Sequence, residues 1–355
     1  MNDLKSAFSL CGEGKKEEDR LNFSSIRERV ESFVDYEIFS TPGHKGEIVK
    51  SDITEYDEDR LFPGKQIEIA EEKASNHYGV KKIRFSVGGS SLAIKASLLA
   101  IKGDVIAPSF SHRCLREGLA LAGKKGYFFD TKREDGLPAV PTVDDYLKEI
   151  KKHKTAKALF VTSPDYFGRV ADVKAIRSLC DEYGLLLIAD CAHGAHFASR
   201  RDLFPDGAEK YAHFACLSAH KTLRSLTQSA YTVIGDERYF DAFGEALTLL
   251  GTSSPSYLLL SSLEEAIAFE QENGERYTAL CDAVKKLKAS VPCLDSDDIL
   301  RIVVKAKDGE ALYHALIERK IMPETYFGNY CVFIVTLSDS VEKVERLRKT
   351  LLELV

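Results

Sequence analysis

The stretch Leu185-Leu186-Leu187-Ile188-Ala189-Asp190-Cys191-Ala192-His193 joins an unbroken apolar run to an acid. A short run of this kind predicts a strand that is buried on both faces, which is typical of a parallel sheet covered by helices. Asp190 would then lie at the carboxyl end of that strand, where burying an unpaired carboxylate is costly. We therefore expect Asp190 to meet a cationic partner.

Further short β-rich runs lie on both sides of this strand, and helical runs separate them. The alternation predicts an α/β fold in which a mostly parallel, seven-stranded sheet is covered by helices on both faces. The expected strands are Ile83–Val87, Asp104–Ala107, Gly126–Phe129, Ala158–Thr162, Leu185–Ala189, Phe214–Leu217 and Tyr231–Ile234. The expected helices are Ser91–Ala100, Cys114–Ala122, Val143–Lys151, Val173–Tyr183 and a shorter Pro205–Tyr211.

The pattern changes after Gly251, where a long helical stretch from about Ser256 to Lys288 leads into a small α+β domain. The expected elements of that domain are the strands Ile299–Val304 and Tyr330–Leu337 and the helices Gly309–Arg319 and Ser340–Leu352. Near the N-terminus, residues 11–30 are polar and charged, which predicts a surface helix or arm. Another helix is expected after Pro63-Gly64. The sequence thus predicts an N-terminal arm and loop (1–50), a large domain (51–255) and a helix linker with a small C-terminal domain (256–355).

The composition argues against several classes of protein. The 355 residues are 44% hydrophobic, enough for a large core, and the net charge of -6 argues against a nucleic-acid partner. No apolar stretch reaches the ~20 residues of a membrane span, and the N-terminus lacks the layout of a signal peptide. The eight cysteines form no Cys-x-x-Cys pair, so we expect no zinc ribbon and a cytoplasmic location.

Polar or small residues follow several of the expected strands. Gly88, Ser163, Asp190 and Ser218 each lie just past, or at the end of, such a strand. Ligands of parallel sheets bind at the carboxyl ends of the strands, so these residues could converge although they are far apart in the chain. We expect them to form one site.

The turn Gly88-Gly89-Ser90-Ser91 precedes an expected helix. Unpaired backbone N–H groups and the helix dipole favour an anion at such a terminus, and glycine lets the backbone approach it closely. The turn could therefore bind a phosphate. The alternative is an ordinary serine N-cap.

A lysine lies in the run Ser218-Ala219-His220-Lys221-Thr222. In a buried pocket its pKa would fall, so Lys221 could act as an imine-forming nucleophile. Ser218 and His220 are suited to phosphate oxygens, and a protonated pyridine nitrogen would offset the burial of Asp190. Together with the phosphate turn, these features predict a site for pyridoxal 5'-phosphate (PLP). His112, which follows another strand, could stack on the pyridine ring or be a polar loop residue.

A metal site is the alternative for the segment after Asp190. His193 and His196 lie three and six residues on, and an acid with two histidines could ligate a metal. That interpretation leaves Lys221 and the glycine-serine turn without a role. We therefore predict no metal.

At this point the residues are similar to a known family. The chain resembles the bacterial ornithine/lysine/arginine decarboxylases, which are PLP enzymes of the aspartate aminotransferase fold (fold type I). The similarity runs from about residue 40 to 270 and continues more weakly to the end. The matching segments are Thr41–Gly46, Ser86–Ser91, Ser111-His112, Ser163-Pro164 with Gly168, Asp190–His196, Ser218–Leu223 and Thr252–Tyr257.

The resemblance implies a role for each matching residue. Lys221 would be the Schiff-base lysine, Asp190 the partner of the pyridine nitrogen and His112 the histidine that stacks on the ring. Ala192 would lie against the other ring face, with His193 near it. The implied phosphate ligands are Ser90, Ser91, Ser218 and His220, with Gly89 in the same turn. The segment with Thr252 and Ser254 is similar to one that reaches a neighbouring subunit's phosphate site, which implies at least a homodimer with shared active sites.

The chain departs from the family pattern in three places. The turn Gly88–Ser91 and the run Ser163–Gly168 differ from the family's usual residues. The sequence also lacks the N-terminal wing domain and the longer C-terminal region of the large members. These departures leave every cofactor residue in place, but they bear on substrate and assembly.

The expected reaction is decarboxylation of arginine, lysine or ornithine, with Lys221, His220 or another acid returning a proton to Cα. A first alternative is another PLP reaction, such as aminotransfer, in which Arg301 would hold the α-carboxylate unless it lies at the surface. A second is a PLP-binding protein without activity. The side chain of a basic substrate needs an acidic partner, and the candidates are Glu324, Glu55, Asp57 and Asp59.

Overall fold

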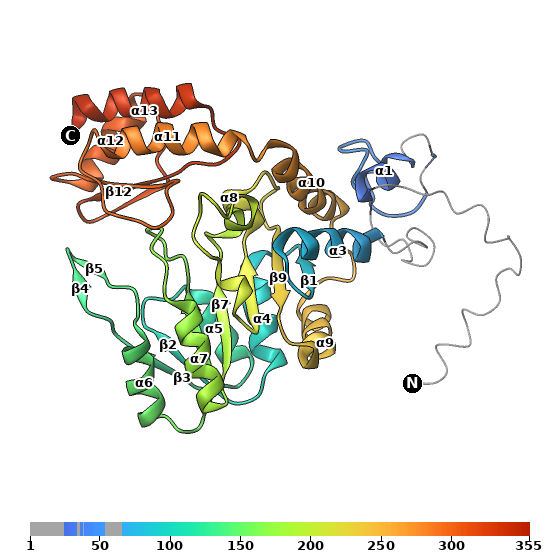
Figure 1. Cartoon of the computed structure of the whole chain (residues 1–355). Helices are drawn as coiled ribbons and strands as arrows, with labels where there is room; N and C mark the ends of the chain where they lie inside the picture. Colours follow the sequence, from blue (N-terminus) through green and yellow to red (C-terminus); the bar gives the residue numbers. More distant parts are fainter. Residues whose placement is uncertain (1–24, 34–35, 38, 54–65) are drawn as a thin grey trace, which may run out of the picture.

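A seven-stranded sheet runs through the body of the chain in the computed structural model, which describes residues 25–33, 36–37, 39–53 and 66–355 (Figure 1). The strand order is β1-β9-β8-β7-β6-β2-β3. The bounds are β1 Ile83–Ser86, β2 Asp104–Pro108, β3 Gly126–Phe129, β6 Ala156–Thr162, β7 Leu186–Asp190, β8 Phe214–Leu217 and β9 Ala230–Ile234. All seven predicted strands are confirmed, with ends that differ by two residues or fewer.

The sheet is mostly parallel, as predicted. β9 pairs antiparallel with both of its neighbours, β1 and β8, while the other neighbouring strands pair in parallel. The chain therefore enters β9 at the edge where the six other strands end. This reversal matters for the site, because it adds the residues that precede β9 to the carboxyl edge of the sheet.

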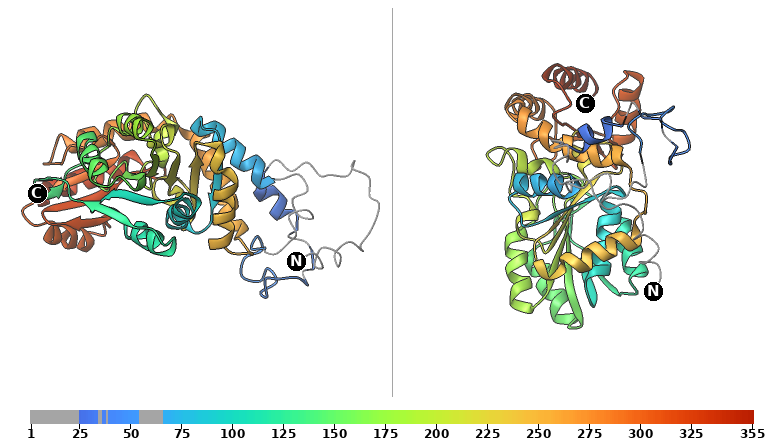
Figure 2. Two further views of the ribbon diagram at one scale, coloured as in Figure 1. Left: turned by 90° about the horizontal axis from the view of Figure 1, so that it is seen from below. Right: turned by 90° about the vertical axis from the view of Figure 1, so that its right-hand side faces the viewer.

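Helices cover both faces of the sheet (Figure 2). Within β7, Leu187 and Ala189 pack into one hydrophobic cluster and Ile188 into the other, so both faces of the strand are buried as its unbroken apolar run predicts. On the face of Leu187 lie α3 Gln66–Tyr78, α6 Val143–Lys152, α7 Val173–Tyr183 and α10 Tyr257–Asn273. On the face of Ile188 lie α4 Gly89–Ala100, α5 Arg113–Leu121 and α9 Phe240–Leu250.

A three-stranded antiparallel sheet follows in the C-terminal part, in the order β10-β12-β11. It packs with its helices around a third hydrophobic cluster. The domain bounds given above stay a prediction. The elements are α11 Arg276–Lys288, β10 Arg301–Lys305, α12 Gly309–Glu318, β11 Thr325–Phe327, β12 Tyr330–Ile334 and α13 Val341–Leu354.

Several expected elements need correction. The single long helix after Ser256 is two helices, α10 and α11, because the chain breaks at Gly274, whose carbonyl accepts a hydrogen bond from Arg200. Pro205–Tyr211 holds only a 3-10 turn at Ala208–Lys210, since proline and glycine disfavour a helix interior. The α-helices and strands that the sequence did not predict are α8 Ala219–Thr222, α9, β11 and the hairpin of β4 Arg133–Glu134 and β5 Leu137–Pro138.

Near the N-terminus, the described residues form α1, Ile26–Glu31. The rest of the expected arm at 11–24 lies outside the described residues. In the part of the chain that the structure describes, no helix is long and apolar enough to cross a bilayer.

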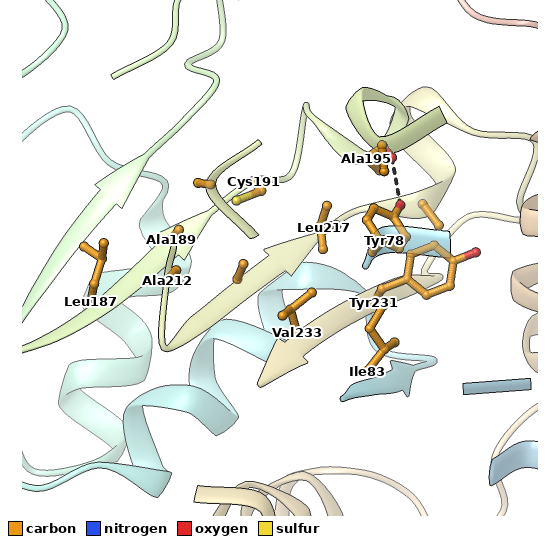
Figure 3. Close-up of a cluster of buried hydrophobic side chains, with 14 of the residues drawn as sticks. Tyr78, Ile83, Leu187, Ala189, Cys191, Ala195, Ala212, Leu217, Tyr231 and Val233 are labelled. Atoms are coloured by element: carbon orange, nitrogen blue, oxygen red, sulfur yellow. Dashed lines mark hydrogen bonds between the residues drawn. The ribbon is translucent and has the colours of Figure 1, made fainter. Parts of the chain in front are cut away.

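Tyr78, which packs against Tyr231 in the core, connects the core to the segment that follows β7 (Figure 3). Their rings lie 5.8 Å apart, and both are fully buried. The Tyr78 hydroxyl donates a hydrogen bond of 2.7 Å to the carbonyl of Ala195. Because Ala195 lies between His193 and His196, this bond fixes the backbone that carries both histidines.

We expect Tyr78→Phe to destabilise the fold by about 1–2 kcal/mol, because the variant leaves the buried Ala195 carbonyl without this donor. Urea unfolding followed by circular dichroism measures the change. Tyr183→Phe, at an exposed tyrosine, is the control and should unfold with the wild type. A Tyr78→Phe midpoint equal to that of the wild type would show that the hydrogen bond adds nothing.

Candidate active site

A cavity of about 460 Å³ opens at the carboxyl edge of the seven-stranded sheet. Most of the residues that line it lie at or just past the carboxyl ends of β1, β2, β6, β7 and β8, where the sequence predicts a site. The structure thus brings together residues that are spread over more than a hundred positions, while their individual roles stay predictions. The predicted residues that line it are Gly89, Ser90, Ser91, His112, Asp190, Ala192, His193, Ser218, His220 and Lys221.

The turn after β1 forms one end of the cavity, where the sequence predicts a phosphate. Gly89 has a φ of +71°, which favours glycine, and its N–H donates to the carbonyl of Gln228 at 2.7 Å. Helix α4 begins at Gly89, and its N-cap, Gly88, provides no side-chain hydrogen bond. The interpretation of Ser90 as an ordinary N-cap is therefore wrong. The Ser90 hydroxyl instead accepts from Ser218 at 2.7 Å, which places two hydroxyls beside an uncapped helix terminus.

Asp190 lies at the end of β7 and is 4% exposed. One of its oxygens, Oδ1, accepts a hydrogen bond of 3.0 Å from the N–H of Ala192. Burial raises the pKa of Asp190, while that N–H, Lys221 and His112 lower it. A buried carboxylate on the wall of a cavity fits a protonated ring nitrogen, which would offset the cost of burial.

Lys221 lies in α8, the short helix Ala219–Thr222 that follows β8. Its Nζ is 3.2 Å from Nε2 of His193. Burial lowers the pKa of Lys221, an effect that the carboxylates of Asp190 and Glu324 oppose. An amine with a lowered pKa is a better nucleophile near neutral pH.

Two other histidines line the cavity. His112 is the N-cap of α5, where its Nδ1 accepts from the N–H of Cys114 at 3.3 Å. The ring therefore caps a helix as well as lining the cavity. Nδ1 of His220 is 3.1 Å from the carbonyl of Ser229, a contact that this nitrogen can make only as a donor. A neutral His220 would then present Nε2 as an acceptor, and would need a second proton to donate to a phosphate oxygen.

Several of the predicted residues do not line the cavity. Ser163, which was expected to converge with Asp190 and Ser218, is buried, and its hydroxyl accepts from the N–H of Ala171 at 3.2 Å. Thr252 and Ser254 are in the linker between α9 and α10 and do not line the cavity. Their expected place in a neighbouring subunit's site stays a prediction. Glu324 lies behind Tyr166, whose hydroxyl donates to it at 3.0 Å. The other acidic candidates, Glu55, Asp57 and Asp59, lie outside the described residues.

Arg301 is fully buried, so its assignment to the surface is wrong. It begins β10, and its Nη2 is 3.0 Å from Nδ1 of His193. Nε2 of His196 is 3.2 Å from Asp298, close to Arg301 in sequence. A guanidinium against His193 disfavours the metal interpretation, since it would repel a cation bound there. Among the residues that the structure describes, no group of three candidate ligands could hold a metal.

Several residues of the cavity were missed by the sequence analysis, and they are Phe110, Thr162, Asp165, Tyr166, Thr227 and Gln228. Thr162 ends β6 and lies opposite Asp190 in the parallel register, so the strand-end rule could have found it. Its buried hydroxyl has no hydrogen-bond partner among the described residues, which leaves it free for a ligand. Gln228 precedes the antiparallel strand β9, whose direction the sequence did not reveal.

The residues of the cavity fit PLP in three respects. An uncapped helix terminus with two hydroxyls suits the phosphate, and a buried carboxylate suits the ring nitrogen. A half-buried lysine with a lowered pKa suits the covalent attachment. The free hydroxyl of Thr162 is one further polar group that such a ligand could satisfy.

Comparison with known structures shows that the chain has the fold of the type I PLP enzymes. Lysine decarboxylase LdcF from Francisella novicida superposes with a TM-score of 0.77 at 17% identity, over 93% of this chain and 59% of that one. Lysine decarboxylase A from Pseudomonas aeruginosa gives 0.78 at 15% identity, with the same coverage of 93% and 59%. SPT solved with PLP gives 0.64 at 15% identity, over 80% of this chain and 75% of that one.

Sequence comparison is more specific. Arginine decarboxylase of Bacillus subtilis (strain 168) is 31% identical over 206 residues, which cover 56% of this chain and 42% of that protein. The arginine decarboxylase of Bacillus cereus is 28% identical over 215 residues, covering 59% of this chain and 47% of that protein. The chain thus matches less than half the length of either protein. The family model of the Orn/Lys/Arg decarboxylase major domain matches residues 37–339. With most of its length matched, the chain belongs to the Orn/Lys/Arg decarboxylase family.

Proposed function

We propose that the chain is a PLP-dependent decarboxylase of a basic amino acid: arginine, lysine or ornithine. The observation that carries the proposal is the single cavity in which Lys221, Asp190 and the Ser90–Ser218 pair meet. Membership of the Orn/Lys/Arg decarboxylase family supports the choice of reaction, and the relatives named arginine decarboxylase and lysine decarboxylase support the choice of substrate class.

In this proposal each wall of the cavity holds one part of the cofactor. The first turn of α4, with Ser90, Ser91 and Ser218, holds the phosphate, and Asp190 holds the ring nitrogen. His112 and Ala192 lie against the two faces of the ring. When bound, PLP supplies an electron sink for the bond that breaks at Cα.

The chain's own residues would then position the substrate and move its protons. Lys221 provides the amine next to the reacting carbon, and burial, which lowers its pKa, favours the neutral form. Asp190 remains the counter-charge at the far end of the cavity. After CO2 leaves, Lys221 or His220, which both line the cavity, would return the proton to Cα. Two acidic side chains are candidate partners for the side chain of a basic substrate. Asp165 lines the cavity and pairs with Arg169, and Glu324 accepts a hydrogen bond from the hydroxyl of Tyr166.

A panel of amino acids tests the reaction. The purified chain is incubated with PLP and with arginine, lysine, ornithine or neutral amino acids, and the products are identified by mass spectrometry. We expect CO2 and agmatine or a diamine from at least one basic substrate. Keto acid without CO2 would favour an aminotransferase. No turnover of any amino acid by PLP-loaded protein would favour a cofactor-binding protein that lacks activity.

We expect Ser90→Ala to weaken PLP binding by about tenfold, because one hydrogen bond to the charged phosphate is lost. Titration of the cofactor's absorbance measures the change. Ser178→Ala, in the exposed part of α7, is the matched control and should bind as the wild type does. Unchanged affinity in Ser90→Ala would place the phosphate elsewhere.

A homodimer with shared active sites is part of the same proposal. Thr252 and Ser254 would reach the partner's phosphate, as the family resemblance implies. Exposed large apolar side chains support an interface with a partner subunit. Leu249, just before this linker, is 77% exposed, and Phe39 and Ile48 are 90% and 78% exposed. Sedimentation equilibrium would show the dimer, and a monomer with full activity would contradict shared sites.

We also propose a reducing compartment such as the cytoplasm. The seven cysteines in the described part of the chain are free, and six of them are buried.

A further inference from the structure

We infer that Arg301 is a positioning residue that sets the tautomer of His193, and that this tautomer holds the Lys221 amine in its unprotonated form. Three side chains from distant parts of the chain form a row in the structure. Nη2 of Arg301 is 3.0 Å from Nδ1 of His193, and Nε2 of the same ring is 3.2 Å from Nζ of Lys221. The inference deepens the proposed function, because it rests on Lys221 as the reacting amine.

Hydrogen-bond chemistry leaves one arrangement of protons along this row. A guanidinium has donors and no acceptor, so His193 must accept at Nδ1. A ring that accepts at Nδ1 cannot be an imidazolium, so it is neutral and carries its proton on Nε2. Nε2 must then donate to Lys221, and an amine can accept a hydrogen bond only when it has lost its extra proton.

Burial and the cationic groups around the row act in the same direction, and Asp190 and Glu324 oppose them at Lys221. Burial, followed by Arg301 and Lys221, holds the pKa of His193 well below its ordinary value. Burial also lowers the pKa of Lys221, and Arg301 adds to this effect. The groups that face His193 are Arg301, Lys221, His112, His196 and Tyr166, and those that face Lys221 are Asp190, Glu324, Arg301, Cys114 and His193.

Close packing confines the side-chain stem of Arg301. Its side-chain stem packs against Gly168, where a Cβ would come within 2.6 Å of the Cβ of Arg301. Gly168 has a φ of +81°, so both space and backbone conformation require glycine there. Asp298 accepts from His196 at 3.2 Å and from the N–H of Leu300 at 3.0 Å, which fixes the turn that leads into β10.

The row also links two parts of the molecule. His193 and His196 follow β7 of the large sheet, whereas Asp298 and Arg301 belong to the C-terminal part. Histidines spaced three residues apart thus contact an acid and an arginine spaced three residues apart. Among the described residues, the C-terminal part therefore acts on Lys221 through His193, without contributing a side chain to the wall of the cavity.

Nitrogen NMR of the full chain, labelled with 15N-histidine and freed of cofactor with hydroxylamine, tests the tautomer directly. The signals of His193 are identified by their loss in His193→Gln. We expect Nδ1 of His193 to be unprotonated and Nε2 to carry the proton. A proton on Nδ1 in the wild type would overturn the inference, and this measurement needs no Arg301 variant to fold.

Competitive labelling of the cofactor-free chain with acetic anhydride tests the effect on Lys221. Peptide mass spectrometry follows the labelling rate at position 221 as a function of pH. We expect Arg301→Met to slow labelling at neutral pH by about tenfold, the change that a rise of one pH unit in the pKa of a mostly protonated amine produces. Arg301→Lys keeps a cationic donor and should restore the wild-type rate.

A purely structural role for Arg301 predicts a different result. It would lower the melting temperature of Arg301→Met but leave the pH profile of Lys221 and the tautomer of His193 unchanged, and that outcome would refute the inference. Because substrate turnover is not measured, a failure here is distinct from a failure of the proposed reaction, which the amino-acid panel reports.

Discussion

Replacing Lys221 with alanine is expected to lower turnover by at least about a thousandfold, since the reacting amine and a candidate proton donor are lost together. The variant should also lose the yellow absorbance of the bound cofactor, and borohydride should no longer fix PLP onto position 221. The rest of the cavity should persist, because Asp190 and the Ser90–Ser218 pair make their contacts without Lys221. Product analysis by mass spectrometry and absorbance titration measure both effects.

The control is Lys81→Ala, at an exposed lysine that pairs with Glu237 on the surface. It should keep full activity and bind cofactor as the wild type does. A Lys221→Ala protein that remains active and retains the covalent absorbance would show that another amine carries the cofactor. Recovery of partial activity on adding a small primary amine would support the assignment further, since such an amine can enter the space that the side chain leaves.

The sheet could be predicted from the sequence because its strands carry a strong local signal. The run that forms β8 is apolar throughout and the run that forms β7 is apolar up to Asp190, and a strand that is buried on both faces needs such a run. Helix α9 was missed, although it packs on the same sheet. Gly244 lies in its middle and weakens the helical pattern, so tertiary packing rather than local preference stabilises it.

Some residues of the candidate site could likewise be predicted from the sequence and others could not. The strand-end rule predicts that Asp190 and Ser218 lie together, because the carboxyl ends of parallel strands share an edge, and both residues line the cavity. Gln228 could not be found by this rule, since it precedes a strand that runs the other way. The sequence names Arg301 as a candidate for the α-carboxylate, but its contact with His193 could not be predicted. That contact depends on how the C-terminal part packs against the large sheet, which no local pattern encodes.

Asp190→Asn is the substitution with the second largest expected effect. The asparagine has the same shape, and its oxygen can still accept from the N–H of Ala192 at the place of Oδ1. The negative charge is lost, however, so the ring nitrogen would no longer be held in its protonated form. We expect turnover to fall by about a hundredfold or more, with weaker cofactor binding. Asp181→Asn, at an exposed ion pair with Arg177, is the control.

Although Asp190→Asn should lower turnover, it should raise the stability of the cofactor-free protein near neutral pH. Burial raises the pKa of Asp190 above its unfolded value. For a carboxyl with a raised folded pKa, stability is greatest at acid pH and is lost as the pH rises through the folded pKa. The wild type therefore loses stability through this carboxyl as the pH rises toward neutral, and Asp190→Asn removes that loss. Melting temperatures should be higher for the variant at neutral pH, and the difference should shrink in acid. If the variant instead melts lower than the wild type at neutral pH, the hydrogen bonds of Asp190 stabilise the fold by more than its burial costs. That result would contradict the view that this carboxyl is kept at the expense of stability.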